Sequence, residues 1–264
     1  MGLAHGIHGW TDVAVPDMEA GEAFYTSVFD WDAREGGAGE SMPYTMFSSE
    51  GKLVAGMGPL SPDQVAAGTP PAWSCYIIVD DVDALQARAV ELGATPLMEP
   101  MQIMDSGKMT SLLDPTGAAI GFWQSGTHDG AEVFNVPGAV TWNELATTDV
   151  EAAKSFYSEL LGWEGSAMEM DGGSEYWMFT NAGRMNGGAY DLTAILPEGT
   201  PSHWMTYFCV DDCDAVAERV RQHGGLVLSE PTDFSMGRMA VVADPFGATF
   251  SIMAGSQFDG QPPR

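Results

Sequence analysis

Basic residues are scarce in this sequence. Its 264 residues include 10 Lys and Arg against 37 Asp and Glu, which gives a formal net charge of −27. Phosphate groups would meet a repelling field, so we exclude sequence-independent nucleic-acid binding and association with anionic membrane surfaces. Cysteine is also scarce. Cys75, Cys209 and Cys213 are an odd number without metal-type spacing, so no disulfide framework is expected.

Long apolar runs are missing as well. A run such as Tyr76–Val79 is far too short to cross a bilayer. The first ten residues have neither a basic n-region nor an apolar h-region, so we expect no signal peptide and a cytoplasmic location. With 45% hydrophobic and 18% charged residues, the composition is globular, and the length predicts two domains or one large domain.

The chain consists of two copies of one pattern. Residues 9–31 resemble residues 141–163, and Trp10 aligns with Trp142 at an offset of 132 (142 − 10). The D-P-x-G-A motif at Asp114 recurs at Asp244, an offset of 130 (244 − 114). The sequence is therefore a tandem duplication, and we refer to its two halves as copy 1 and copy 2.

Each copy in turn contains two similar halves. A half begins with a short strand, continues with an acidic helix start and an amphipathic helix, and ends in several short strands. The paired acids at Asp80 and Asp211 are interpreted as helix caps. We predict a first domain at 1–125, a linker at 126–138, a second domain at 139–256 and a loose tail at 257–264.

This layout, with a D-P-x-G turn before each closing strand, resembles the vicinal oxygen chelate superfamily. That group contains glyoxalase I, bleomycin-resistance proteins and extradiol dioxygenases. The resemblance covers nearly the whole chain and is strongest to two-domain, glyoxalase-like bacterial proteins. It implies an α+β fold in which four βαβββ modules form two curved mixed sheets with helices on the convex side. The ligand would lie on the concave face of each sheet.

The usual metal ligands of the family are missing from this sequence. Family members hold a divalent ion with His and carboxylate side chains on the concave strands. The matching positions here are Trp10, Ser74 and Gly121 in copy 1 and Trp142, Met205 and Ser251 in copy 2. We therefore predict no metal site and no cofactor. His8 shares the strand parity of Asp12, which leaves open a relocated site containing both.

Strand alternation predicts which side chains line the concave faces. The candidate ligand-binding residues are Trp10, Ser74, Tyr76 and Trp123 in copy 1 and Trp142, Met205, Tyr207 and Ser251 in copy 2. One carboxylate is predicted in each cleft, Asp12 in copy 1 and Glu144 in copy 2. These are the candidate catalytic residues, because apolar surroundings would raise their pKa and allow them to act as general bases. Aromatic walls favour flat, apolar ligands. The alternative is that Trp10 and Trp142 only fill the space of a lost metal site.

The sequence thus predicts a glyoxalase- or bleomycin-resistance-like protein that binds a small, aromatic organic molecule and either sequesters it or acts on it by acid/base chemistry. Two alternatives stay open: a metal-dependent glyoxalase- or dioxygenase-like enzyme with relocated ligands, and an interaction protein with filled clefts. A homodimer is considered, because family members often dimerise. His128 is expected to be exposed, and Lys108 and Arg238 are weighed as ligands for a substrate oxygen.

Overall fold

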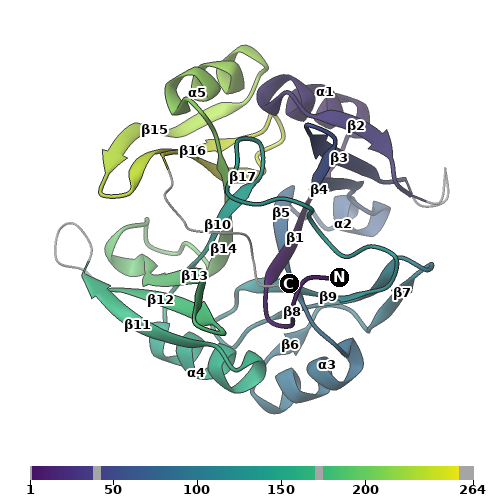
Figure 1. Cartoon of the computed structure of the whole chain (residues 1–264), viewed down its shortest axis with the longest axis vertical. Coiled ribbons are helices and arrows are strands. Elements are labelled where there is room, and N and C mark those ends of the chain that lie inside the picture. Colours follow the sequence, from purple (N-terminus) through teal and green to yellow (C-terminus); the bar gives the residue numbers. More distant parts are fainter. Residues whose placement is uncertain (1, 38–42, 170–174, 256–264) are drawn as a thin grey trace.

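The structure is a computed structural model that describes residues 2–37, 43–169 and 175–255, and it contains two mixed β-sheets (Figure 1). The predicted tail at 257–264 lies outside the described residues. The strands of the first sheet are β1 (His8–Val15), β2 (Asp32–Glu35), β3 (Thr45–Ser49), β4 (Lys52–Pro59), β5 (Ala72–Ile78), β6 (Thr95–Pro96), β7 (Met101–Ile103), β8 (Gly107–Leu113) and β9 (Ala119–Ser125). The strands of the second are β10 (Val140–Thr147), β11 (Glu164–Glu169), β12 (Glu175–Asn181), β13 (Arg184–Asp191), β14 (His203–Cys209), β15 (Leu226–Phe234), β16 (Gly237–Ala243) and β17 (Thr249–Ala254).

Four longer helices begin directly after the acidic residues at which the sequence predicts helix starts. They are α1 (Met18–Phe29), α3 (Val82–Glu91), α4 (Val150–Leu161) and α5 (Cys213–Gln222). Each begins with an aspartate whose carboxylate accepts the N–H of the residue three positions later, at 2.9–3.1 Å. The capping interpretation of the paired acids is thus confirmed for Asp81 and Asp212. Two short helices in the connectors, α2 (Pro62–Ala66) and η2 (Leu192–Ala194), were not predicted.

The register of each sheet explains how residues from two half-copies reach one cleft. β1 pairs with β5 in the antiparallel sense and with β4 in the parallel sense, while β5 pairs in parallel with β9. This places Trp10 beside Tyr76 and Asp12 beside Ser74. The second sheet repeats the arrangement around β10 and β14. The predicted α+β fold, with two mixed sheets built from repeated modules, is therefore confirmed.

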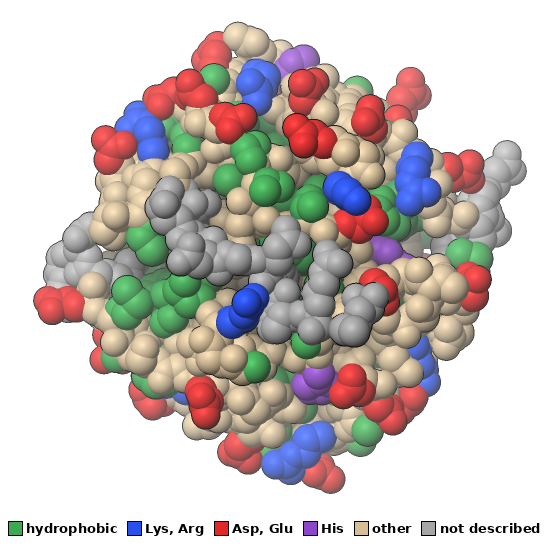
Figure 2. All heavy atoms as spheres, in the orientation of Figure 1, with side chains coloured by type: hydrophobic (Ala, Val, Ile, Leu, Met, Phe, Trp, Pro, Cys, Tyr) green, Lys and Arg blue, Asp and Glu red, His purple; other side chains and the backbone are tan. Residues whose placement is uncertain are grey.

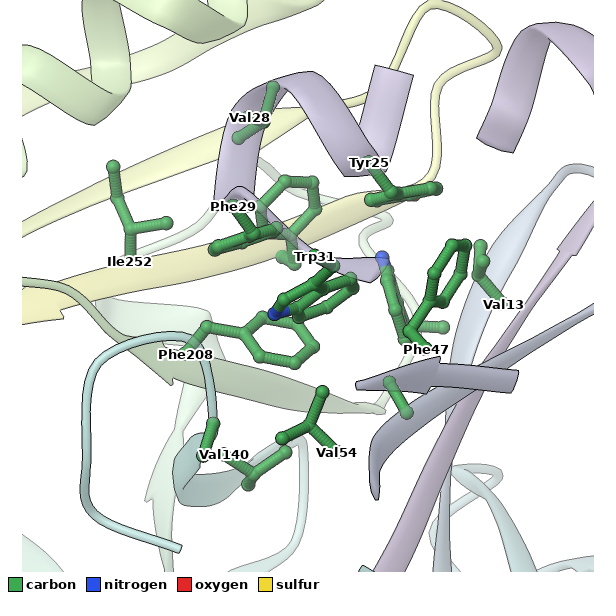
Figure 3. Packing of buried hydrophobic residues seen from close by; sticks show 14 of the residues in the cluster. Val13, Tyr25, Val28, Phe29, Trp31, Phe47, Val54, Val140, Phe208 and Ile252 are labelled. Carbon is green, nitrogen blue, oxygen red and sulfur yellow. The ribbon is translucent and has the colours of Figure 1, made fainter. Parts of the chain in front are cut away.

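The two copies share their hydrophobic cores reciprocally. In Figure 1, α1 lies beside α5 and α3 lies beside α4, so the first module of each copy packs against the second module of the other. Figure 3 shows α1 supplying Phe29 to a cluster that also holds Phe208 of copy 2, with ring centroids 5.1 Å apart. The second shared core joins Phe122 of copy 1 to Phe156 of copy 2.

Buried polar contacts reinforce this exchange between the copies. The Asp of each D-P-x-G turn accepts a hydrogen bond from a helix tyrosine of the other copy. Tyr157 Oη lies 2.9 Å from Asp114 Oδ2, and Tyr25 Oη lies 3.0 Å from Asp244 Oδ2. Both tyrosines are fully buried, so each aligned contact satisfies a hydroxyl that would otherwise be costly inside the core.

Most acidic side chains other than these two buried aspartates lie on the surface. On the face drawn in Figure 2, acidic side chains are spread around the rim over the helices rather than gathered in one patch. No helix in the ranges that the structure describes is long and apolar enough to cross a membrane.

Candidate ligand-binding clefts

The concave face of the first sheet carries a hydrogen-bonded tetrad around one carboxylate. Tyr44 Oη donates to Asp12 Oδ2 at 3.0 Å, and Tyr76 Oη donates to Asp12 Oδ1 at 3.2 Å. Trp10 Nε1 in turn donates to Tyr44 Oη at 3.0 Å. The strand pairing that sets Trp10 beside Tyr76 thus also points Asp12 between two phenol groups.

Tyr44 reaches the tetrad because the neighbouring strand lacks a side chain beneath its ring. Tyr44 lies one residue before β3, and a Cβ atom built at Gly56 of β4 would lie 2.0 Å from Tyr44 Oη. The same relation holds in copy 2 between Gly188 and Tyr176, also at 2.0 Å. A glycine at this place is therefore a geometric requirement of the tetrad.

Burial controls the ionisation of the tetrad. Removal from water raises the pKa of Asp12 to about 6, although its two tyrosine hydrogen bonds oppose the shift. Burial also raises the pKa values of Tyr44 and Tyr76 well above the usual phenol value, and the nearby Asp12 charge adds to the effect. Above pH 6 the cleft therefore holds one carboxylate that accepts hydrogen bonds from two neutral phenols.

A cavity of about 180 Å³ lies against this tetrad. Its walls are mostly aromatic or sulfur-containing side chains. The lining residues are Trp10, Asp12, Gly36, Gly37, Tyr44, Met46, Tyr76, Ile103, Met104, Ser106, Met109, Trp123 and His128. The cleft thus combines an apolar, polarisable wall with a single charged acceptor, which is the composition of a site for a small organic molecule.

Copy 2 repeats the tetrad with a longer carboxylate. Tyr207 Oη donates to Glu144 Oε2 at 2.5 Å, and Trp142 Nε1 donates to Tyr176 Oη at 2.8 Å. Tyr176 also hydrogen-bonds to Glu144, and burial raises the pKa of Glu144 against both tyrosine contacts. The two concave faces therefore share one polar core.

The surroundings of that core differ between the copies. The counterpart of Gly58 is Tyr190, whose ring packs against the copy 2 tetrad, and the counterpart of Ser74 is Met205, which packs there as well. Tyr176 and Met178 are buried, whereas Tyr44 and Met46 are half-buried. Copy 2 therefore has larger side chains beside its tetrad, and Tyr176 and Met178 are more buried than their counterparts in copy 1.

The structure brings most of the predicted residues into the two clefts. Trp10, Asp12, Tyr76 and Trp123 line the copy 1 cavity, and Trp142, Glu144, Met205 and Tyr207 meet in copy 2. Two predicted positions lie differently. Ser74 is half-buried beside Asp12 without lining the cavity, and Ser251 is fully buried beside Tyr207.

Three cleft residues escaped the sequence analysis. Tyr44 and Tyr176 do align at the offset of 132 (176 − 44), so the repeat contains a signal that could have identified them. His128 was expected to be exposed, and this prediction is wrong. The segment that follows β9 folds back over the cleft, and His128 lines the cavity. No local sequence pattern marks that return.

The expectation that His8 points to the same face of β1 as Asp12 is wrong. The register of β1 shifts between His8 and Trp10, so His8 does not face the cleft with Asp12. Its ring lies between the copies, 4.9 Å from the Trp204 ring and 5.4 Å from the Trp163 ring. Neither ring nitrogen has a hydrogen-bond partner among the residues described, and burial lowers the pKa of His8 to about 3.

The two weighed cations also lie away from the clefts. Lys108 pairs with Asp83 in the first turn of α3, and Arg238 pairs with Asp214 in the first turn of α5 at 2.6 Å. These contacts hold the strands β8 and β16 to the helices on the opposite side of the sheets. Neither side chain lines the copy 1 cavity.

The residues at the family metal positions do not fit a divalent ion. Copy 1 offers the indole of Trp10, the hydroxyl of Ser74 and no side chain at Gly121. The one adjacent carboxylate, Asp12, already accepts two tyrosine hydroxyls. Across the described ranges, no group of three or more His, Cys, Asp or Glu side chains is arranged to hold a metal.

This arrangement of two tandem sheets with concave clefts defines a glyoxalase-like fold. The chain belongs to the Glyoxalase/Bleomycin resistance protein/Dioxygenase superfamily, whose sequence model matches residues 7–122 and 139–252. A solved structure with the same fold is the Mn(II)-bound glyoxalase from Novosphingobium aromaticivorans, with a TM-score of 0.65 and 16% identity over 98% of this chain and 86% of that one.

Two full-length relatives are much more similar in sequence. The protein named "Putative glyoxylase CFP32" from Mycobacterium tuberculosis is 40% identical over 253 residues, 94% of each chain. The Anthracycline biosynthesis protein DnrV from Streptomyces peucetius is 38% identical over 266 residues, 95% of this chain and 94% of its own.

Proposed function

We propose that the copy 1 cleft binds a small aromatic molecule that carries a hydroxyl or amine donor. The observation that supports this is the position of Asp12, a half-buried carboxylate at the wall of an aromatic cavity. A ring would pack against Trp10 and Trp123, and its donor would bind Asp12. The tyrosine hydroxyls occupy one approach to each carboxylate oxygen, and a second lone pair on each oxygen stays available to a ligand.

The size of the cavity limits the ligand. An engineered cavity of roughly 150 Å³ in another protein binds benzene, so about 180 Å³ suits one substituted ring. A larger fused-ring compound would insert one ring and leave the rest at the mouth. The relative DnrV is named for anthracycline biosynthesis, and anthracyclines are fused-ring aromatic compounds, which agrees with this ligand class.

The tetrad also suits proton transfer. With its pKa raised to about 6 by burial, Asp12 is basic enough to accept a proton from a bound ligand near neutral pH. Tyr44 and Tyr76 hold the carboxylate in place, and Trp10 fixes Tyr44. We therefore extend the proposal to general-base chemistry by Asp12 on a ligand hydroxyl or an adjacent acidic C–H group, with no step assigned to a metal.

The proposal is tested by titrating the protein with phenol and measuring binding by tryptophan fluorescence and by calorimetry. Wild-type protein should bind phenol, and Asp12→Asn should bind it about tenfold more weakly, because a hydrogen bond to a charged acceptor is lost. Glu144→Gln is the matched control and should bind like the wild type. Thermal unfolding of each variant would verify folding. Absence of phenol binding by the wild type, or equal binding by Asp12→Asn, would contradict the proposal.

A further inference from the structure

His128 enters the copy 1 cleft from the segment that joins the two copies. Its backbone is fixed on both sides, because its N–H donates to the Ser106 carbonyl at 3.1 Å and its own carbonyl accepts Trp123 Nε1–H at 2.9 Å. The backbone of His128 is thus held by the turn before β8 and by Trp123 of β9. His128 is therefore a built part of the cleft wall.

The imidazole ring stands against the aromatic wall of the cavity. Its centroid lies 4.4 Å from Trp10 at an interplanar angle of 85° and 5.7 Å from Trp123 at 67°. The same ring lines the cavity that Asp12 lines. A ligand ring beside Trp10 would thus lie within the reach of two polar groups on two different segments.

The Nε2 atom of His128 is buried and lacks a hydrogen-bond partner within the described residues. A buried polar atom without a partner destabilises a folded protein, so such atoms usually serve a function or meet a water or ligand. Because His128 lines the cavity, a small rotation of its ring would bring this buried nitrogen to a bound molecule, which can then supply the missing partner.

The charge of the ring restricts what that molecule is. Burial lowers the pKa of His128, and Arg34 lowers it further, against opposing effects of Asp129 and Glu132. The imidazole is therefore neutral at pH 7, while the neighbouring Asp12 is negative. This combination disfavours anionic ligands and favours neutral ones, because a neutral imidazole nitrogen donates or accepts one hydrogen bond without needing a counter-charge.

We propose that His128 is a second ligand-contacting residue and that it makes the cleft selective for neutral phenols bearing another hydroxyl or carbonyl group elsewhere on the molecule. The phenol O–H binds Asp12, and the second oxygen binds His128 Nε2. This inference rests on the proposed function of the cleft. It adds a specificity determinant that comes from outside the βαβββ modules.

Comparing two ligands in two proteins tests the inference. Phenol offers one polar group, whereas 3- and 4-hydroxybenzyl alcohol offer a second hydroxyl that both donates and accepts. Wild-type protein should bind one of the hydroxybenzyl alcohols about tenfold more tightly than phenol, the value of one additional buried hydrogen bond. His128→Phe keeps a ring against Trp10 and should remove that advantage, so that the ratio between the affinities for the hydroxybenzyl alcohol and for phenol falls to about one.

Two further variants complete the experiment. His128→Gln restores a hydrogen-bonding group and should recover part of the advantage, while His223→Phe places the same substitution at an exposed position and should change nothing. Equal weakening of all ligands by His128→Phe, or an unchanged advantage, would overturn the role of His128 while phenol binding still supports the cleft. Failure of wild-type protein to bind any of these ligands would overturn both proposals.

Discussion

The two clefts of this protein have the same polar core and different surroundings. Each holds a tryptophan, two tyrosines and one carboxylate, joined by hydrogen bonds at corresponding positions. In copy 1 a cavity of about 180 Å³ lies against this core. In copy 2, Tyr190 and Met205 pack against it. The comparison shows that the same tetrad forms beside small neighbours in copy 1 and beside larger neighbours in copy 2, so we expect the neighbouring residues to decide which copy binds a ligand.

The largest expected effect comes from giving copy 1 a residue that differs between the two clefts. A Cβ atom at Gly58 would lie 3.4 Å from the Tyr44 ring, an ordinary contact, so a side chain fits there beside a ring that lines the cavity. Gly58→Tyr should therefore weaken phenol binding about 100-fold or more by occupying the site. Calorimetry measures this, with Tyr190→Ala plus Met205→Ser as the reverse exchange, expected to add a second binding site. Unchanged binding by Gly58→Tyr would place the ligand elsewhere.

The comparison extends to the opposite side of the sheets, where each copy holds the other. Tyr157→Phe removes the hydroxyl donor to Asp114 and also the acceptor of Trp204 Nε1, whereas Tyr25→Phe removes the donor to Asp244. We expect the free energy of unfolding to fall by about 3 kcal/mol for Tyr157→Phe and about 2 kcal/mol for Tyr25→Phe. Urea unfolding measures both values. A larger loss for Tyr25→Phe would contradict this difference.

A buried histidine marks a further difference between the copies. His8 corresponds to Val140 at the offset of 132 (140 − 8), and both residues are buried. Burial lowers the pKa of His8 from 6.5 to about 3, so the unfolded chain binds a proton below pH 6.5 that the folded protein does not. Stability associated with His8 is therefore lost as the pH falls from 6.5 towards 3.

His8→Val copies the residue of the second copy and should remove this pH dependence. The free energy of unfolding of the variant minus that of the wild type should be about 2 kcal/mol larger at pH 5 than at pH 7. Urea unfolding at the two pH values measures the shift. Parallel pH profiles for both proteins would show that His8 ionises equally in the folded and unfolded states.

The smallest effect concerns the ionisation of the open cleft. The pKa of Asp12 is raised to about 6 by burial, so its carboxylate is mostly ionised at pH 7 and mostly protonated at pH 5. Because the neutral form should bind about tenfold more weakly, phenol affinity should fall about fivefold between pH 7 and pH 5. Phenol itself does not ionise in this range. Asp12→Asn should give a flat profile, while a pH-dependent profile in that variant would assign the titration to another group.

Much of the fold could be predicted from the sequence because its determinants are local and repeated. The four helix starts follow the capping aspartates, and the offset between Trp10 and Trp142 reveals the duplication. The alternation of β1 and β5 also gives the correct facing for Trp10, Asp12 and Tyr76. The domain boundaries, the cytoplasmic location and the homodimer stay predictions.

The remaining features depend on contacts that no short sequence window contains. His8 is misplaced by one irregularity in β1, since a single shift of register reverses the face of every residue before it. Tyr44 precedes its strand and reaches Asp12 only because Gly56 leaves room for the ring. His128 enters the cleft because its segment hydrogen-bonds to the Ser106 carbonyl, a tertiary contact without a sequence signature.

The reciprocal cores have a consequence for synthesis on the ribosome. Phe250 and Ile252 of β17 complete the hydrophobic core around α1. The hydrogen bond from Tyr25 to Asp244 forms only after another 219 residues of the chain have been synthesised. Until the last strand emerges, this helix lacks the copy 2 rings of Phe208 and Phe250 that complete the burial of Phe29. Part of the apolar face of α1 is therefore uncovered for nearly the whole of translation, and we expect folding of the first copy to be completed slowly, after β17 has been synthesised.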